Sequence, residues 1–147
     1  MSELIRESIE ELQTIAPGHK IIIGVCDNIK VFADREKMHS VISNLVSNAV
    51  KYSSMGSSVY IECWLADQQL TVSVKDEGMG INPLDAEKIF DRFYRVDNHE
   101  TQYISGFGIG LYLSAEIIRH HGGRIWLESK QGSGSTFYFS IPLKAHS

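Results

Sequence analysis

Seven apolar residues at helical spacing constrain this fold more than any other feature of the sequence. They are Met38, Val41, Ile42, Leu45, Val46, Ala49 and Val50. Asp34, which precedes them, has the chemistry of a helix N-cap. A stripe this wide must be buried against a second layer, because a single helix cannot shield it from water. The sequence therefore predicts a helix that begins after Asp34 and packs on another layer.

Short apolar segments, several of them alternating, are candidates for that second layer. They cover residues 20–25, 30–32, 59–65, 70–74, 124–129 and 135–141. The polar pair Asp67-Gln68 predicts a hairpin turn between two of them. Further helices are predicted at residues 3–15, 82–89 and 110–121. Because strands and helices mix without strict alternation, we expect an α/β (α+β) two-layer sandwich with a mixed sheet.

The bulk properties exclude several classes of protein. A length of 147 residues fits one domain with a real core. The net charge of −4 offers no basic field for nucleic acid, so no nucleic-acid partner is expected. No run of 18 apolar residues exists, and we expect a cytoplasmic location. Cys26 and Cys63 form no CxxC motif and are expected to be reduced thiols.

The predicted central helix carries polar residues along one edge of its apolar stripe. Asn44, Asn48, Lys51 and Tyr52 lie at positions i, i+4, i+7 and i+8. Asparagine is a poor interior helix former, so two of them one turn apart suggest amides that face a cleft. An amide oxygen can ligate Mg²⁺, and a nearby lysine can reach a phosphate. A solvated helix edge is the alternative.

A short acidic and glycine-rich motif, Asp76-Glu77-Gly78-Met79-Gly80, follows directly after a predicted strand. A carboxylate at a strand end can accept a hydrogen bond from an amino group such as that of adenine. The glycines after it let a flat ring approach the backbone. A plain turn is the alternative, because Asp and Gly are common turn residues.

A second glycine-rich motif opens the helix predicted at residues 110–121. It reads Gly106-Phe107-Gly108-Ile109-Gly110-Leu111. Free N–H groups at a helix start bind phosphate through hydrogen bonds and the helix dipole. The motif is neither a Walker A loop nor a dinucleotide-binding GxGxxG sequence.

The segment between these two motifs contains residues 90–95, with three aromatic residues and the arginines Arg92 and Arg95. Aromatic side chains can anchor a loop while arginines point at phosphates. The end of a surface helix is the alternative. No clean period persists from residue 90 to 108, and a loop of that length in a compact domain is usually functional or mobile.

In this order, the four elements resemble the ATP-binding domain of sensor histidine kinases. The same superfamily holds gyrase B subunits, MutL and the ATPase heat-shock chaperones. Residues 44–53 resemble its N box, 76–80 its G1 box, 90–95 its F box and 106–111 its G2 box, and residues 132–137 resemble its closing glycine motif. The resemblance covers residues 18–143. It implies the Bergerat fold, a mixed, mostly antiparallel sheet of about five strands with helices on one face.

The resemblance implies ATP and Mg²⁺ as cofactors and gives each matched residue a role. On the adenine side, Asp76 binds the amino group, Thr136 supports it, Tyr52 packs nearby, and Gly78 and Gly80 allow the ring to approach. On the phosphate side, the residues are Asn44, Lys51, Arg92, Arg95, Gly106, Phe107, Gly108, Ile109, Gly110 and Leu111. Asn48 is the implied Mg²⁺ ligand, and Asn44, Asn48, Lys51 and Arg95 form the implied catalytic set. Residues 90–108 correspond to the ATP lid, and we expect this lid to be poorly ordered without nucleotide.

The residue at position 44 separates branches of the superfamily. The ATP-hydrolysing branches carry a glutamate base there, whereas Asn44 cannot take a proton. This favours a kinase whose nucleophile is a neutral imidazole, because phosphoryl transfer depends mainly on positioning and charge neutralisation. An anti-sigma-type serine kinase is the runner-up, although its usual acid is missing at this position. A nucleotide-dependent binding module without catalysis stays open.

None of the histidines of the chain has the sequence context of a phosphoacceptor. They are His19, His39, His99, His120, His121 and His146. The acceptor is therefore expected on a separate phosphoacceptor domain of the same kinase, with a response regulator downstream. Residues 1–16 are interpreted as the end of a dimerisation-domain helix, frayed or paired with another chain, and residues 17–147 as the catalytic domain. The chain is expected to be monomeric and its parent a homodimer, with or without a membrane anchor.

Overall fold

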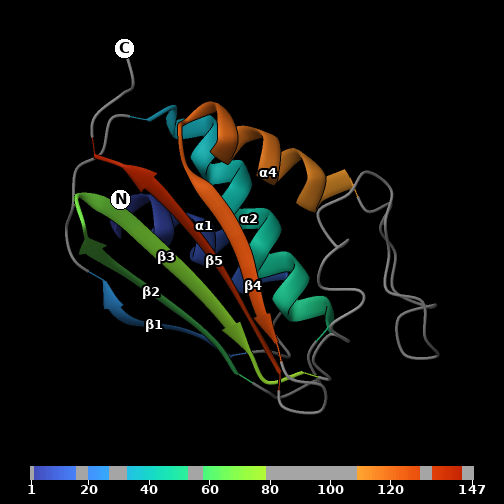
Figure 1. Cartoon of the computed structure of the whole chain (residues 1–147). Coiled ribbons are helices and arrows are strands. Elements are labelled where there is room, and N and C mark those ends of the chain that lie inside the picture. The colour runs from blue at the N-terminus through green and yellow to red at the C-terminus, as the bar shows by residue number, and fades with distance from the viewer. Residues whose placement is uncertain are drawn as a thin grey trace.

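The structure is a two-layer sandwich in which helices cover one face of a sheet. It is a computed structural model that describes residues 2–15, 20–26, 33–52, 58–78, 109–129 and 134–143. The elements in these ranges are α1 (Ser2–Ile15), β1 (Lys20–Cys26), α2 (Arg35–Tyr52), β2 (Ser58–Ala66), β3 (Gln69–Asp76), α4 (Ile109–His120), β4 (Arg124–Ser129) and β5 (Ser135–Pro142). Figure 1 shows α1, α2 and α4 together on one face of the sheet. The predicted sandwich is confirmed, while the segments predicted at 30–32 and 82–89 lie outside the described residues.

The five described strands form a mixed sheet in the order β1-β2-β3-β5-β4. β1 runs parallel to β2, and the other three neighbouring pairs are antiparallel. β2 and β3 form the predicted hairpin around Asp67 and Gln68, whose φ angles are 50° and 61°. A two-residue turn with both φ angles positive matches the twist of the strands that it joins. The sheet is therefore mostly antiparallel, as the resemblance implied.

One apolar core lies between the sheet and the helices. Six of the seven apolar residues predicted to face inward from α2 are fully buried, and Val50 is partly buried. The strands contribute every second residue to this core, as the alternation of side chains along a strand requires. Their buried apolar residues are Val59, Ile61, Cys63, Leu70, Val72, Val74, Phe137, Phe139 and Ile141. α2 contacts β2 and β3, and α4 contacts β4 and β5.

The caps of α2 and α4 fix how these two helices lie together. Asp34 Oδ1 accepts a hydrogen bond of 3.1 Å from the N–H of Lys37, which confirms the predicted N-cap. His121, just after α4, donates from Nδ1 to the carbonyl of Ile117, and its Nε2 accepts from the N–H of Asp34 at 3.1 Å. The end of α4 is thereby joined to the start of α2. The helices run antiparallel, so the start of α4 lies toward the C-terminal half of α2.

The N-terminal helix differs from its expectation. Leu4 and Ile5 of α1 are 5% and 0% exposed and belong to the same core as α2. Two ion pairs join the helices, Arg35 to Glu7 at 2.7 Å and His39 to Glu11 at 3.2 Å. The expectation of a frayed helix is therefore wrong, while pairing with another chain stays a prediction. An amphipathic stripe shows that a helix must be covered but does not show which surface covers it.

The cysteines also differ from their expectation. Cys63, in the core, is disulfide-bonded in this structure, which contradicts the prediction of reduced thiols. Cys26, the other cysteine of the chain, is its Cα partner in the register between β1 and β2. Neither residue stands in a CxxC motif, so the sequence alone gave no sign of a pairing that depends on strand register.

Candidate nucleotide-binding site

The polar edge predicted on the central helix lies on α2 and faces α4 at one point. Asn44 and Asn48 are half-buried, one turn apart. The Asn44 amide donates a hydrogen bond of 3.2 Å to the hydroxyl of Ser114 on α4, whose side chain is fully buried. Lys51 and Tyr52 lie in the last turn of α2, and their side chains fall outside the description. Because the helices are antiparallel, this edge leads from Ser114 toward the start of α4.

Asp76 is the last residue of β3 and is 3% exposed. Its Oδ1 accepts hydrogen bonds from the N–H of Gly78 at 2.9 Å and from the N–H of Ser135 at 3.3 Å. Burial raises the pKa of this carboxyl group, and the two backbone hydrogen bonds oppose that rise. Among the described residues Oδ2 has no hydrogen-bond partner. The structure thus presents a buried carboxylate with one oxygen held and the other open to a ligand donor.

The neighbour of Asp76 on β5 is Ser135, not the predicted Thr136. Ser135 is the register partner of Asp76, and its Oγ lies 2.9 Å from the Oγ of Ser129. Thr136 pairs with Lys75 and points to the opposite face, because successive side chains of a strand alternate. The structure therefore places Ser135, and not the expected Thr136, beside the Asp76 carboxylate. The alternation that places residues 137, 139 and 141 in the core also places Ser135 on their face and predicts this neighbour.

Gly134 approaches the β3 end too closely for any other residue. Its φ is +88°, and a Cβ built on it would lie 2.3 Å from the carbonyl oxygen of Asp76. A side chain at this position would both strain the backbone and push the two strand ends apart. The glycine of the closing motif thus lets β5 begin beside Asp76 and lets the Ser135 N–H reach its carboxylate.

Much of the predicted phosphate side falls outside the description. The residues of this side outside the described ranges are Arg92, Arg95, Gly106, Phe107 and Gly108, and they belong to the predicted lid at 90–108, which is also outside. On the adenine side, Gly80 lies outside the described residues as well. Ile109 and Gly110 open α4, as the sequence predicted for this motif. Leu111 is 7% exposed and belongs to the apolar core, which gives it a packing role.

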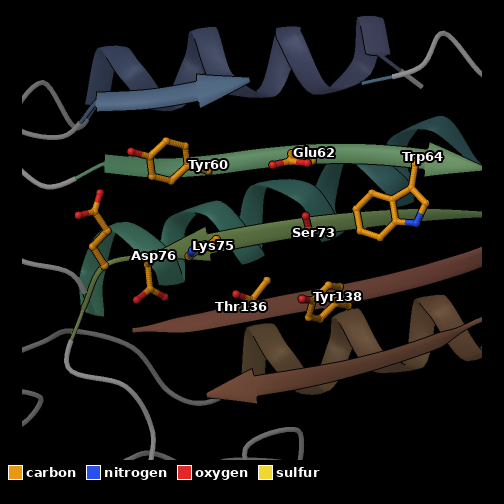
Figure 2. Close-up of a pocket in the computed structure, with 9 residues that line it drawn as sticks. Tyr60, Glu62, Trp64, Ser73, Lys75, Asp76, Thr136 and Tyr138 are labelled. Atoms are coloured by element: carbon orange, nitrogen blue, oxygen red, sulfur yellow. The ribbon is translucent and has the colours of Figure 1, made fainter. Parts of the chain in front are cut away.

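The described elements meet at one end of the sandwich. Figure 1 shows the C-terminal end of α2 and the C-terminal end of β3 at the same end of the molecule, with the start of α4 beside α2. A polar helix edge, a helix N-terminus and a buried carboxylate therefore border one region of the covered face. A hollow of about 740 Å³ lies elsewhere, on the face of the sheet away from the helices, and reaches this region near Asp76 (Figure 2).

Comparison with known proteins identifies the family. The family model described as "Histidine kinase-, DNA gyrase B-, and HSP90-like ATPase" matches residues 33–145. The chain belongs to this ATPase family. Its match includes α2, β3 and the start of α4, which are the elements that border the candidate site.

Sensor histidine kinases are among its relatives. The sensor histidine kinase WalK of Bacillus subtilis (strain 168) is 43% identical over 119 residues, which make up 80% of this chain and 20% of WalK. A nucleotide-free catalytic domain of the histidine kinase ThkA has a TM-score of 0.82 and 33% identity, over 98% of this chain and 93% of that one. Full-length ShkA in complex with AMPPNP has a TM-score of 0.85 and 25% identity, over 99% of this chain and 30% of that one.

The chain is therefore the ATP-binding catalytic domain of a sensor histidine kinase, as its boxes predicted. It spans about a fifth of the length of the curated relatives that it matches. In the described part of the chain, no helix is both long and apolar enough to cross a membrane.

Proposed function

We propose that this histidine kinase domain binds Mg²⁺·ATP between α2, the start of α4 and the C-terminal end of β3. It then passes the γ-phosphoryl group to a histidine of a separate phosphoacceptor domain. The observation that carries the proposal is the Asp76 carboxylate, which is 3% exposed, held through Oδ1 and open at Oδ2. A buried acceptor of this kind selects a ligand that offers an N–H donor, because an unpaired buried charge is costly.

In this proposal Asp76 Oδ2 accepts a hydrogen bond from the adenine amino group. The N–H groups of Gly78 and Ser135 hold the other oxygen in place. A ligand donor favours the ionised carboxylate and so offsets the burial that raises its pKa. Gly78 and Gly80 let the ring approach the backbone, and Tyr52 is predicted to pack beside it.

The phosphates lie toward the start of α4. N–H groups in the first turn of a helix are unsatisfied and attract anions. Gly106, Gly108 and Gly110 are proposed to bring the backbone of the lid close to the triphosphate. Lys51 and Asn44 flank the phosphates from α2, and Arg92 and Arg95 are proposed to reach them from the lid.

Asn48 is the proposed Mg²⁺ ligand. No three His, Cys, Asp or Glu side chains gather to hold a metal ion in the described part of the chain. A neutral amide oxygen nevertheless suits Mg²⁺, which keeps several waters and takes its other ligands from phosphates. Asn48 is half-buried on the edge of α2 that leads toward the start of α4. When bound, the ion neutralises the charge of the triphosphate.

Asn44 is proposed to position the phosphates and not to act as a base. Its amide bonds to Ser114, and an amide takes up no proton at neutral pH. A neutral imidazole needs no base, because the nitrogen that attacks has a free lone pair. This nitrogen forms the bond to the γ-phosphorus while the bond to the bridging oxygen breaks and ADP leaves. This favours a histidine kinase over the serine kinase alternative, whose hydroxyl nucleophile would need a carboxylate at this position to take its proton.

The partners follow from the sensor kinases that the chain resembles. We propose a phosphoacceptor domain of the same kinase as the direct partner and a response regulator downstream. The chain itself is proposed to be monomeric and cytoplasmic, and its parent a homodimer. The assignment of residues 1–16 to the end of a dimerisation helix stays a prediction. Since α1 packs along α2, such a helix would enter the domain on that side.

Calorimetric titration with a non-hydrolysable ATP analogue, with and without Mg²⁺, tests the nucleotide site. Asp76→Asn should weaken binding about 10- to 100-fold, because a hydrogen bond to a charged group contributes about 1.5–3 kcal/mol. Asp67→Asn, the same change in the exposed β2–β3 turn, is the matched control and should bind like the wild type. No saturable binding to the folded wild-type chain would remove the nucleotide site.

Transfer to the phosphoacceptor domain of the same kinase tests the reaction itself. With ATP labelled at the γ-phosphate, we expect an acid-labile label on the acceptor that depends on Mg²⁺. An acid-stable label would support the serine kinase. Binding of the analogue without any transfer would support a nucleotide-dependent binding module.

A further inference from the structure

The face of the sheet away from the helices is rich in aromatic and charged side chains. Figure 2 shows Tyr60, Glu62 and Trp64 following one another along β2, with Tyr138 on β5 across the hollow. The hollow of about 740 Å³ lies over these strands. It is open to solvent on one side and has room for a side chain of a second molecule.

One side of this open face already holds an arginine. The guanidinium carbon of Arg124 lies 4.6 Å from the ring centroid of Trp126. Trp126 stacks on Tyr138, with centroids 5.2 Å apart and the planes inclined by 7°. The Tyr138 hydroxyl donates to Glu128 at 3.2 Å. Arginine, two flat rings and a carboxylate thus form one continuous group on β4 and β5.

The other side of the open face repeats the acid and the rings without the cation. On β2, Glu62 stands between Tyr60 and Trp64, each two positions away and therefore on the same face. Among the described residues no cation lies within 4.0 Å of the Glu62 carboxylate. Gly24 of β1 leaves room for its stem, since a Cβ built on Gly24 would lie 2.9 Å from Glu62 Cγ.

We propose that Tyr60, Glu62 and Trp64, with Tyr138 opposite, bind an arginine side chain presented by a segment of a partner protein. The guanidinium stacks on the rings and pairs with the Glu62 carboxylate, as Arg124 stacks on Trp126 within the chain. A guanidinium suits this place better than an ammonium, because it is planar and forms paired hydrogen bonds to a carboxylate.

The charges around the hollow favour a cation at this end. Burial raises the pKa of Tyr138, and the nearby carboxylates of Glu128 and Glu62 raise it further. Both acids therefore act on the same ring. Lys75 is the register partner of Tyr60, two residues along the strands from the Glu62 row and so about 7 Å away. The positive charge of Lys75 disfavours a second cation beside it. The arginine of the segment therefore lies toward Trp64, and a neutral or acidic residue lies toward Lys75.

The test uses a capped pentapeptide with a central arginine and the same peptide with citrulline, which keeps the shape and loses the charge. Binding to the chain is followed by NMR through the indole N–H signal of Trp64. We expect a saturable shift with the arginine peptide and at least fivefold weaker binding of the citrulline peptide. Glu62→Gln should weaken binding of the arginine peptide at least fivefold. Glu36→Gln removes the same charge from the first turn of α2 and should stay within twofold of the wild type.

Two further measurements separate this surface from the nucleotide site. Measured by calorimetry, because the variant lacks the indole signal, Trp64→Ala should abolish peptide binding, whereas Leu65→Ala, the exposed neighbour on the same strand, should not. Binding of the ATP analogue should be unchanged in Glu62→Gln. The proposal is overturned if the arginine peptide shows no saturable binding, if citrulline binds equally well, or if Glu36→Gln weakens binding as much as Glu62→Gln.

Discussion

The two faces of the sheet share the same strands but have opposite chemistry. On the covered face the side chains of β3 and β5 are apolar until the strand ends, where Asp76 and Ser135 meet. On the open face their immediate neighbours, Lys75 and Thr136, stand among aromatic and charged side chains. A shift of one residue in either strand would exchange these two sets, because side chains alternate with a period of two.

This difference shows where each face of the sheet can carry polar side chains. The covered face is packed against helices. Polar groups can be buried there without a large cost in free energy only where the packing ends and hydrogen-bond partners remain available. The open face has no such restriction, and its polar groups are spread along whole strands. The proposed nucleotide site is therefore confined to one end of the sandwich, while the proposed arginine site lies over the middle of the sheet.

The largest expected effect compares consecutive residues of β5. Phe139 is fully buried on the covered face and Tyr138 is half-buried on the open face. Phe139→Ala should lower the free energy of unfolding by about 3–5 kcal/mol, because it leaves a cavity in the core. Tyr138→Ala should cost about 1 kcal/mol, since only part of the ring leaves water. Urea unfolding of both variants measures the two values, and equal losses would break the distinction between the faces.

The second-largest effect is expected from replacing glycine by alanine, and two glycines are compared. In Gly134→Ala the new Cβ meets backbone at a positive φ, and we expect a loss of about 2 kcal/mol or more. In Gly24→Ala it meets only the exposed Glu62 side chain, which can rotate, so stability should stay within about 1 kcal/mol of the wild type. Thermal unfolding separates them. A Gly134→Ala protein as stable as the wild type would contradict the close approach of β5 to Asp76.

The hydrogen bond between α2 and α4 should have a smaller effect. Ser114→Ala removes the acceptor of the Asn44 amide and should lower stability by about 1 kcal/mol. Affinity for the ATP analogue should also fall, because Asn44 loses one of the contacts that orient its side chain. Ser40→Ala, at an exposed position of α2, is the control. If both variants unfold at the same denaturant concentration, this hydrogen bond makes no net contribution.

The smallest expected effect concerns the charge of Asp76. Burial raises its pKa in the folded state, so the ionised form costs stability at neutral pH, and that cost fades as the pH falls through the raised value. Asp76→Asn keeps an oxygen for the two backbone N–H groups. At pH 7 it should be as stable as the wild type or more stable by up to about 1 kcal/mol. Unfolding measured from pH 7 downward should show this difference shrinking, and a less stable variant at pH 7 would contradict it.

Local patterns in the sequence predicted most of the elements. The stripe of α2, its Asp34 cap and the turn at Asp67-Gln68 are all found in the structure, and the helix predicted from Gly110 begins one residue earlier, at Ile109. Each depends on residues within a few positions of one another, so spacing alone is sufficient. The carboxylate of Asp76 was predicted in the same way, from its place at a strand end.

Three features needed contacts between distant parts of the chain. The sequence marks α1 as amphipathic, but only the fold shows that Ile5 is buried in the same core as α2. The neighbour of Asp76 is decided by the register of β3 with β5, and the Cα partner of Cys63 by the register of β1 with β2. Register is not encoded at any single position, because it results from burying one face of every strand at once.

The sequence by itself determined the family, the order of the boxes and the residue types that suit adenine, phosphate and Mg²⁺. Tertiary structure alone decided that Ser135 and not Thr136 adjoins Asp76, that Asn44 bonds to Ser114, and that Glu62 stands between two rings on an open face. The physical reason is the same in each case. The chemical groups of a side chain are set by the residue type alone, whereas its neighbours across a sheet or between helices are fixed only when the whole core packs.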